Sequence, residues 1–303
     1  MTDKKILWGH IMAAMTIVVW GTTFVSTKVL LESFNPLEIL VYRFVLGLIA
    51  LYAIKPEKMV IKDKKHSLYF ALAGLCGVTL YFLLENIALL YTTAANTGVI
   101  VAVSPLLTAL FSQFFFKGEK LSPAFFLGFI CAITGICIIS FAETSLTISP
   151  KGDLLAFLAS CVWSIYAILC KKIATFGYNA IQTTRQSFLY GIVFMLPALF
   201  IFPFDMNFSL ISQPVNILNL IYLGLGASAL CFVTWNIAVR NLGALKTSAY
   251  IYAVPFVTIS TAALILHEPV THFTVLGTAL TLLGLVISES KLQLKLFFSK
   301  NKM

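Results

Sequence analysis

Long apolar runs recur along the whole chain and constrain its fold more than any other feature. A helix needs about 20 consecutive apolar residues to cross the hydrocarbon core of a bilayer. Ten stretches of roughly that length are present, at residues 7–27, 37–54, 68–90, 95–116, 122–142, 153–171, 185–203, 217–239, 247–266 and 272–289. The sequence therefore predicts an all-α membrane protein with ten transmembrane helices.

Composition agrees with this fold class. Of the 303 residues, 59% are hydrophobic and 11% are charged, whereas soluble domains carry about 25% charged residues. The first apolar run continues through Trp20 without a small-residue cleavage site, so we interpret it as a spanning helix and not as a signal peptide. All six cysteines fall inside predicted spans, which argues against a disulfide framework, and no Cys/His spacing suggests a metal.

Basic residues indicate how the chain is oriented. If the connecting segments alternate between the two sides, beginning inside, then seventeen of the 21 Lys and Arg residues lie on the inner side and two, Lys28 and Lys151, lie on the outer side. This asymmetry is the positive-inside signal of a cell-membrane protein with both termini in the cytoplasm. The net charge of +9 is thereby explained by orientation, and no nucleic acid partner is expected.

The second half of the chain repeats the first. The stretch GLCGVTLYFLLENIA begins at Gly74, and GLGASALCFVTWNIA begins 150 residues later at Gly224. The same offset relates Pro105 to Pro255, and an offset of 149 relates Glu119 to Glu268. We therefore divide the chain into a first five-helix repeat, residues 1–145, and a second, residues 146–303.

The odd number of helices in each repeat determines how the two repeats are oriented in the membrane. Five helices carry the chain from one side of the membrane to the other, so the second repeat must begin on the opposite side and lie inverted. Inverted repeats are typical of secondary transporters, in which two similar halves exchange conformations to open the site to either side.

Three stretches also resemble a known family: WGTTF at residues 20–24, ENIALLYTTAANTGVIVAVSPLLTALFSQFFFKGEKLS at 85–122, and LILHEPVTHFTVLGTALTLLGLVIS at 264–288. They look like the EamA branch of the drug/metabolite transporter superfamily. The resemblance covers nearly the whole chain. It implies ten helices around a central cavity, export or import of small metabolites, and a role for the fifth and tenth helices in support or homodimer formation.

Ionisable side chains within spans are the first candidates for function, because they are costly in a bilayer. Glu85 and Arg43 lie at similar depths in neighbouring predicted helices, roughly 8–9 Å below the outer boundary. Glu85 is therefore expected to form an ion pair with Arg43, to bind a substrate ammonium or a proton in the cavity, or to reach the outer interface. Its repeat equivalent is Trp235, so the acid occurs once, which favours a role in ligand binding.

Other polar residues recur in both repeats. Arg43 corresponds to Arg185, and Asn86 corresponds to Asn236. Recurrence favours a structural role for the two arginines, whereas the two amides can either bridge helices or contact substrate.

Aromatic side chains near the predicted cavity can hold an ammonium by cation–π contact, although those near helix ends also form interfacial belts. The aromatic candidates are Trp20, Trp163, Tyr166, Tyr81, Trp235 and Tyr252.

Two prolines inside predicted spans and two glutamates at predicted helix starts are the last candidates. Pro105 and Pro255 occupy corresponding positions inside predicted spans and should interrupt them, which points to a hinge or to cavity shaping. Glu119 and Glu268 are expected to interact with the N-terminus of the helix that each precedes.

These features predict a secondary transporter for a small metabolite, favoured to be an amino acid or another amine and to be exported. The alternatives are an importer of a vitamin or choline-like cation and, from another class, a membrane-embedded enzyme for lipid head groups. No phosphate-binding glycine loop and no convergent catalytic cluster is present, so no cofactor and no catalytic residue is predicted.

Overall fold

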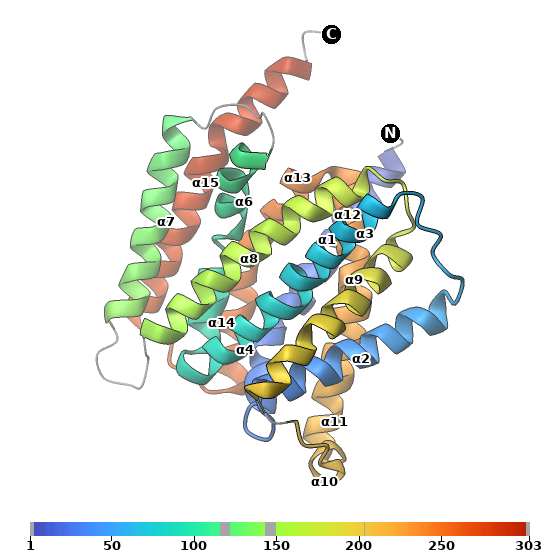
Figure 1. Ribbon diagram of the computed structural model, residues 1–303. Helices are drawn as coiled ribbons and strands as arrows, with labels where there is room; N and C mark the ends of the chain where they lie inside the picture. Colours follow the sequence, from blue (N-terminus) through green and yellow to red (C-terminus); the bar gives the residue numbers. More distant parts are fainter. Residues whose placement is uncertain (1–2, 116–121, 143–149, 203, 301–303) are drawn as a thin grey trace.

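The computed structural model describes residues 3–115, 122–142, 150–202 and 204–300 as a bundle of helices, with no strand among them (Figure 1). In the first half the helices are α1 (Asp3–Leu30), α2 (Pro36–Ile54), α3 (Lys64–Gly74) continuing through the π-helix η1 (Leu75–Leu80) into α4 (Tyr81–Tyr91), α5 (Ala94–Val101), α6 (Ser104–Phe115) and α7 (Pro123–Ala142). Both ends of the described chain lie at the same end of the bundle (Figure 1).

The second half follows the same order. Its helices are α8 (Pro150–Ala174), α9 (Ala180–Met195) with the 3₁₀ turn η2 (Leu196–Phe200), the short α10 (Phe208–Ile211), α11 (Pro214–Ile221) continuing through the π-helix η3 (Tyr222–Leu230) into α12 (Cys231–Leu242), α13 (Ala244–Ser248), the 3₁₀ helix η4 (Ala249–Ala253), α14 (Val254–Ile265) and α15 (His272–Lys300). Among the described residues, each predicted span thus overlaps one helix or a succession of helices.

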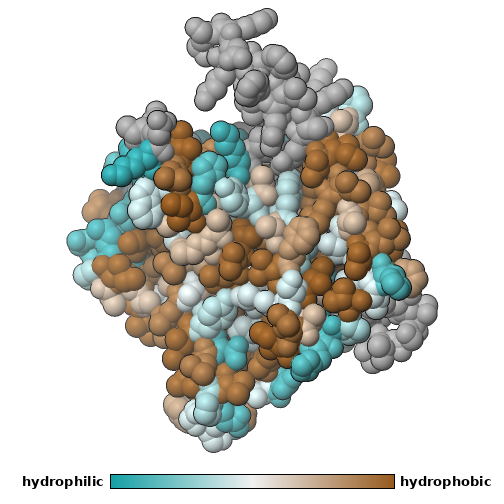
Figure 2. All heavy atoms as spheres, turned by 180° about the vertical axis from the view of Figure 1, so that it is seen from behind, coloured by the Kyte–Doolittle hydropathy of each residue, from teal (hydrophilic) through white to brown (hydrophobic). Residues whose placement is uncertain are grey.

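Eight helical stretches of the described chain are long and apolar enough to cross a membrane. The remaining two predicted spans are shorter by this measure. Helix α9 has 16 residues; it begins with the polar sequence AIQTTRQS and gives way to a 3₁₀ turn at Pro197, which cannot donate a backbone hydrogen bond. The apolar part of α15 covers His272–Ser288. Apolar side chains such as Leu127, Leu264 and Val286 are exposed on the bundle, and apolar residues cover much of the surface in Figure 2.

Helix α2, which carries Arg43, begins at a capping box. The Asn35 side chain accepts hydrogen bonds from the backbone N–H groups of Leu37 and Glu38, at 2.9 and 3.0 Å, and the Glu38 carboxylate accepts one from the Asn35 N–H at 2.8 Å. Pro36 occupies the first turn, where its missing N–H costs nothing. These local signals fix where α2 starts and therefore how deep Arg43 lies.

Two pairs of helix irregularities occur at corresponding positions of the repeats. The chain leaves α-helical geometry between α5 and α6 and again at η4, and Pro105 and Pro255 lie in the first turns of the helices that follow, as the sequence predicts. The π-helices η1 and η3 end at Leu80 and Leu230, which are 150 positions apart. No sequence signal predicted the π-helices, which are rare and often lie at functional sites.

Helices α7 and α15 lie side by side and antiparallel (Figure 1). They approach closely at glycines: a Cβ on Gly128 would lie 2.3 Å from the Gly284 carbonyl oxygen, and one on Gly135 would lie 2.5 Å from that of Gly277. In the sequence repeat Gly128 corresponds to Gly277 and Gly135 to Gly284, so each glycine contacts the equivalent of the other. Such a reciprocal contact is what a two-fold relation between the halves produces.

Candidate functional site

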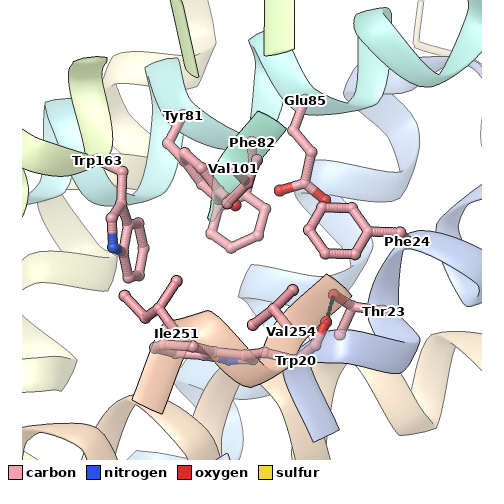
Figure 3. A pocket seen from close by; sticks show the side chains of 10 residues that line it. All are labelled: Trp20, Thr23, Phe24, Tyr81, Phe82, Glu85, Val101, Trp163, Ile251 and Val254. Carbon is pink, nitrogen blue, oxygen red and sulfur yellow. Dashed lines mark hydrogen bonds between the residues drawn. The ribbon is translucent and has the colours of Figure 1, made fainter. Parts of the chain in front are cut away.

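A cavity lies among α1, α4, α5, α8, η4 and α14, and it is lined by residues of both halves of the chain (Figure 3). Its lining consists of Trp20, Thr23, Phe24, Tyr81, Phe82, Glu85, Val101, Trp163, Ile251 and Val254. The volume of the cavity is about 30 Å³, which is room for about two waters. The cavity is therefore narrow in this structure.

Glu85 is the acidic group of this cavity. Its side chain is 1% exposed, and its carboxylate points toward the cavity beside Phe24 (Figure 3). The oxygen Oε1 has no hydrogen-bond partner. Glu85 and Arg43 do not approach to salt-bridge distance, although Arg43 and Tyr81 are near enough to interact with the carboxylate electrostatically. The predicted direct ion pair and the predicted reach to the interface are therefore both wrong, whereas ligand binding by Glu85 stays a prediction.

Arg43 is fully buried behind the cavity wall. Its Nε donates a hydrogen bond of 3.1 Å to the Ser228 hydroxyl in η3, whereas Nη1 and Nη2 have no hydrogen-bond partner. The guanidinium carbon lies 4.2 Å from the centre of the Phe82 ring. Since Phe82 also lines the cavity, this ring is the layer between the guanidinium and the cavity.

Three of the predicted aromatic residues line the cavity. The Trp20 and Trp163 rings meet edge to face at 5.2 Å, and the Trp163 ring lies 4.8 Å from that of Tyr81. The Trp20 indole N–H is held by the Ala227 carbonyl at 3.0 Å, which orients its face. An ammonium in the cavity would thus meet aromatic rings on several sides.

The other three aromatic candidates lie outside the cavity lining. Trp235 packs against Trp20 at 5.1 Å, and Tyr166 packs against Trp163 at 4.9 Å, both nearly buried in the layer behind the cavity. Tyr252 packs with a separate hydrophobic cluster, which is formed by residues of α4, α5, α6, α7, α8 and α15. The sequence could not distinguish these positions, because a Trp or Tyr in a helix has the same spacing whether it faces the cavity or its support.

The two repeated amides bond to other helices. Asn86 Nδ2 donates to the Pro36 carbonyl at 3.0 Å, and Asn236 Nδ2 donates to the Thr184 hydroxyl at 3.0 Å. Asn86 therefore connects α4 to α2, and Asn236 connects α12 to α9. Asn86 does not line the central cavity, and Asn236 lines a different cavity between α8, α9 and α12.

Arg185 lies on α9, next to the C-terminal end of α2. Its Nη1 donates to the Lys55 carbonyl and its Nη2 donates to the Glu57 carbonyl at 2.7 Å, and the guanidinium lies 4.3 Å from the Tyr52 ring. Arg185 thereby secures the end of α2. It has the contacts of a structural arginine, which its repeat equivalent Arg43 lacks.

Five apolar lining residues were not predicted: Phe24, Phe82, Val101, Ile251 and Val254. In a membrane protein the lipid, the helix interfaces and the cavity walls are all apolar, so hydrophobicity does not identify them. Helical spacing offers a partial signal. Phe24 lies one turn after Trp20, so the two side chains share a face of α1.

Glu268 lies in the loop between α14 and α15, and its contacts correct the sequence-based expectation. Its two carboxylate oxygens accept hydrogen bonds from the Ala94 and Ala95 N–H groups, at 2.8 and 3.0 Å, so it binds the N-terminus of α5 and not that of α15. Lys28 interacts with Glu268 and donates a hydrogen bond of 2.5 Å to the Thr92 carbonyl. Helices distant in sequence are therefore joined here at one end of the bundle. Glu119, its repeat equivalent, lies outside the described residues.

We expect Glu268→Ala to lower the free energy of unfolding by about 0.5–2 kcal/mol, as the loss of a helix N-cap does. Thermal unfolding of the purified protein in detergent measures this change. Glu32→Ala is the control, since Glu32 is exposed at the end of α1. Equal melting temperatures for the two variants would contradict a stabilising role for this contact.

Among the residues that the structure describes, no three His, Cys, Asp or Glu side chains are grouped to hold a metal ion. The groups of the candidate site are thus the Glu85 carboxylate, the Arg43 guanidinium behind Phe82, and the aromatic side chains that line the cavity.

Comparison with known proteins identifies the family. The EamA-like transporter family matches the chain twice, at residues 7–141 and at residues 150–289. The chain belongs to the EamA-like transporter family. One match lies in each half of the chain, and together they include every residue of the cavity lining.

Relatives of similar length are named as transporters. An uncharacterized transporter of Archaeoglobus fulgidus is 26% identical over 287 residues, covering 93% of this chain and 97% of its own. A probable terminal-alkyne amino-acid exporter of Streptantibioticus cattleyicolor is 25% identical over 285 residues, covering 94% and 93%. One solved crystal structure aligns with a TM-score of 0.65 at 19% identity, covering 92% of this chain and 97% of that one, and supports the fold alone. The protein is a membrane transporter.

Proposed function

We propose that this EamA-like transporter moves a small amine, such as an amino acid, across the cell membrane by alternating access, with Glu85 binding the ammonium of the substrate. The observation that carries the proposal is the unpartnered Glu85 carboxylate oxygen in an aromatic-lined cavity. A buried carboxylate oxygen without a hydrogen-bond partner is costly, and a bound ammonium would remove that cost. The rings of Trp20, Trp163 and Tyr81 suit the same cation.

The topology we propose has ten spans, arranged as two inverted repeats with both termini in the cytoplasm. The distribution of Lys and Arg supports the orientation, and the reciprocal glycine contacts of α7 and α15 support the two-fold relation. The interruptions before Pro105 and Pro255 border the cavity through Val101, Ile251 and Val254. They are therefore suited to act as hinges when the cavity opens.

We favour export because one relative of similar length is named a probable amino-acid exporter. Uptake of a choline-like or vitamin cation is the second candidate, since the aromatic walls suit a quaternary ammonium as well. Glu85 is also suited to bind a proton in alternation with the substrate, so that transport of the two would be coupled. A homodimer through the exposed apolar side chains of α7 and α15 is a further part of this proposal.

Counterflow in proteoliposomes tests the proposed function. Vesicles are loaded with one unlabelled compound, either an amine (an amino acid or choline), an anion or an uncharged metabolite. They are then diluted into a trace of the same labelled compound, with protein-free vesicles as the control. We expect transient, saturable accumulation for at least one amine substrate. If anions or uncharged metabolites accumulate and amines do not, Glu85 does not bind an ammonium and the proposal is wrong.

An imposed pH gradient tests the coupling in the same vesicles. We expect the gradient to drive accumulation by the wild type, because an acidic side chain at the binding site can carry a proton in one direction and an amine in the other. Accumulation that does not depend on the pH gradient would indicate uniport or substrate exchange.

A further inference from the structure

Arg43 has the features of a ligand-binding group that lacks its ligand. A guanidinium offers five N–H donors in a planar fork. At Arg43 a hydrogen bond to Ser228 is formed from Nε, and both terminal nitrogens are buried without a hydrogen-bond partner. Burying a charge in this way is costly unless the charge is paired.

The repeat supplies a direct comparison. Arg185, the equivalent residue, uses both terminal nitrogens to bond backbone carbonyls at the end of α2. An arginine that serves the packing of this fold is therefore fully engaged. Arg43 is at least as buried as Arg185 and yet forms fewer hydrogen bonds, so packing alone does not account for it.

The position of Arg43 connects it to the cavity. The guanidinium lies against the Phe82 ring, and Phe82 and Glu85 are neighbouring lining residues on α4. Arg43 and Glu85 interact electrostatically but do not form a salt bridge. The site thus holds one positive and one negative side chain, each with unused hydrogen-bonding capacity, and of the two rings against the guanidinium, Phe44 and Phe82, only Phe82 lines the cavity.

We propose that Arg43 forms a concealed anion subsite behind Phe82, so that the substrate carries a carboxylate or similar anion in addition to its ammonium. This inference rests on the proposed function. A zwitterion would satisfy both Glu85 and Arg43, whereas a plain amine would leave the guanidinium unpaired. A planar carboxylate matches the guanidinium fork, which it can bind through two parallel hydrogen bonds.

The narrow cavity is consistent with a subsite that forms on binding. With room for about two waters, the cavity of about 30 Å³ requires side chains to move before a metabolite enters. Rotation of the Phe82 ring away from Arg43 would widen the cavity and uncover the guanidinium in one movement.

The test compares matched ligands on the purified protein. Leucine, isoamylamine and leucine methyl ester share a side chain and an amine, but only leucine has a carboxylate; phenylalanine, phenethylamine and phenylalanine methyl ester form a second series. A hydrogen-bonded charge pair corresponds to about tenfold to hundredfold in affinity. We therefore expect the wild type to bind the better amino acid about tenfold or more tightly than its amine and its ester.

Variants then assign the preference to Arg43. In Arg43→Gln we expect the amino acid and its amine to bind about equally, because the anion subsite is lost while Glu85 remains. Arg43→Lys keeps a positive charge and should retain part of the preference. Arg185→Gln is the matched control from the other repeat and should keep the wild-type ratio of the two affinities.

The outcomes separate this inference from the proposed function. If the wild type binds amine, ester and amino acid equally, the anion subsite is wrong and ammonium binding by Glu85 stands. If the preference persists in Arg43→Gln, another group binds the carboxylate and the inference is also wrong. If no compound of either series binds, the proposed function fails and this inference fails with it.

Discussion

Replacing Glu85 by Gln is expected to weaken amine binding strongly without lowering the stability of the protein. The loss of a charge-assisted contact to an ammonium should weaken binding by about tenfold to hundredfold. The wild-type carboxylate is buried without a salt bridge, so a neutral amide of the same shape removes a desolvation cost and breaks no ion pair. The melting temperature of Glu85→Gln should therefore equal or exceed that of the wild type.

Thermal unfolding with and without ligand measures both effects in one experiment, because a ligand that binds the folded state raises its apparent stability. Breaking a buried ion pair costs about 3–5 kcal/mol. If Glu85→Gln lost that much stability, Glu85 would be the structural partner of Arg43 after all. Asn86→Ala is the matched control on the same helix: it removes the bond to the Pro36 carbonyl and should lower stability without abolishing amine binding.

Much of the fold could be predicted because the bilayer simplifies the problem. Every backbone group in the hydrocarbon region must be bonded within the segment, so a long apolar run implies a helix. The interruptions before α6 and within the α13–α14 run could be predicted from Pro105 and Pro255, because proline removes a helical hydrogen bond. The π-helices η1 and η3 were missed, because no residue type requires a π turn. The partner of Glu268 was missed as well, because it lies on α5, distant in sequence.

The site could be predicted only in part. Glu85 stood out because an acid in an apolar span is unusual, and the repeat showed that it occurs once. Phe82 did not stand out, since a phenylalanine has the same hydrophobicity facing lipid, a neighbouring helix or a cavity. The contacts of the two arginines also differ, although their recurrence in the repeat favoured a structural role for both. The two arginines occupy matching positions in the repeat but have different hydrogen-bond partners. This difference depends on how η3 packs against α2, which the sequence does not show.

A second large effect is expected at the glycine contacts between α7 and α15. In Gly135→Ala the new methyl group would lie 2.5 Å from the Gly277 carbonyl oxygen and 2.6 Å from the Thr281 backbone nitrogen. Both are backbone atoms of a helix, which cannot move aside as a flexible side chain can. The two helices must separate, and overpacking of this kind costs about 1–3 kcal/mol.

Gly226→Ala is the matched control, because its methyl group would meet no atom nearer than the Tyr222 ring, at 3.7 Å. Denaturation of both variants in the same detergent should show a large loss for Gly135→Ala and a small change for Gly226→Ala. Close contact through small residues is how helices associate in membranes, where no hydrophobic driving force acts between them. If Gly135→Ala were as stable as Gly226→Ala, the two helices would not be in backbone contact in the membrane protein, and the reciprocal glycine pairs would no longer support a two-fold relation between the repeats.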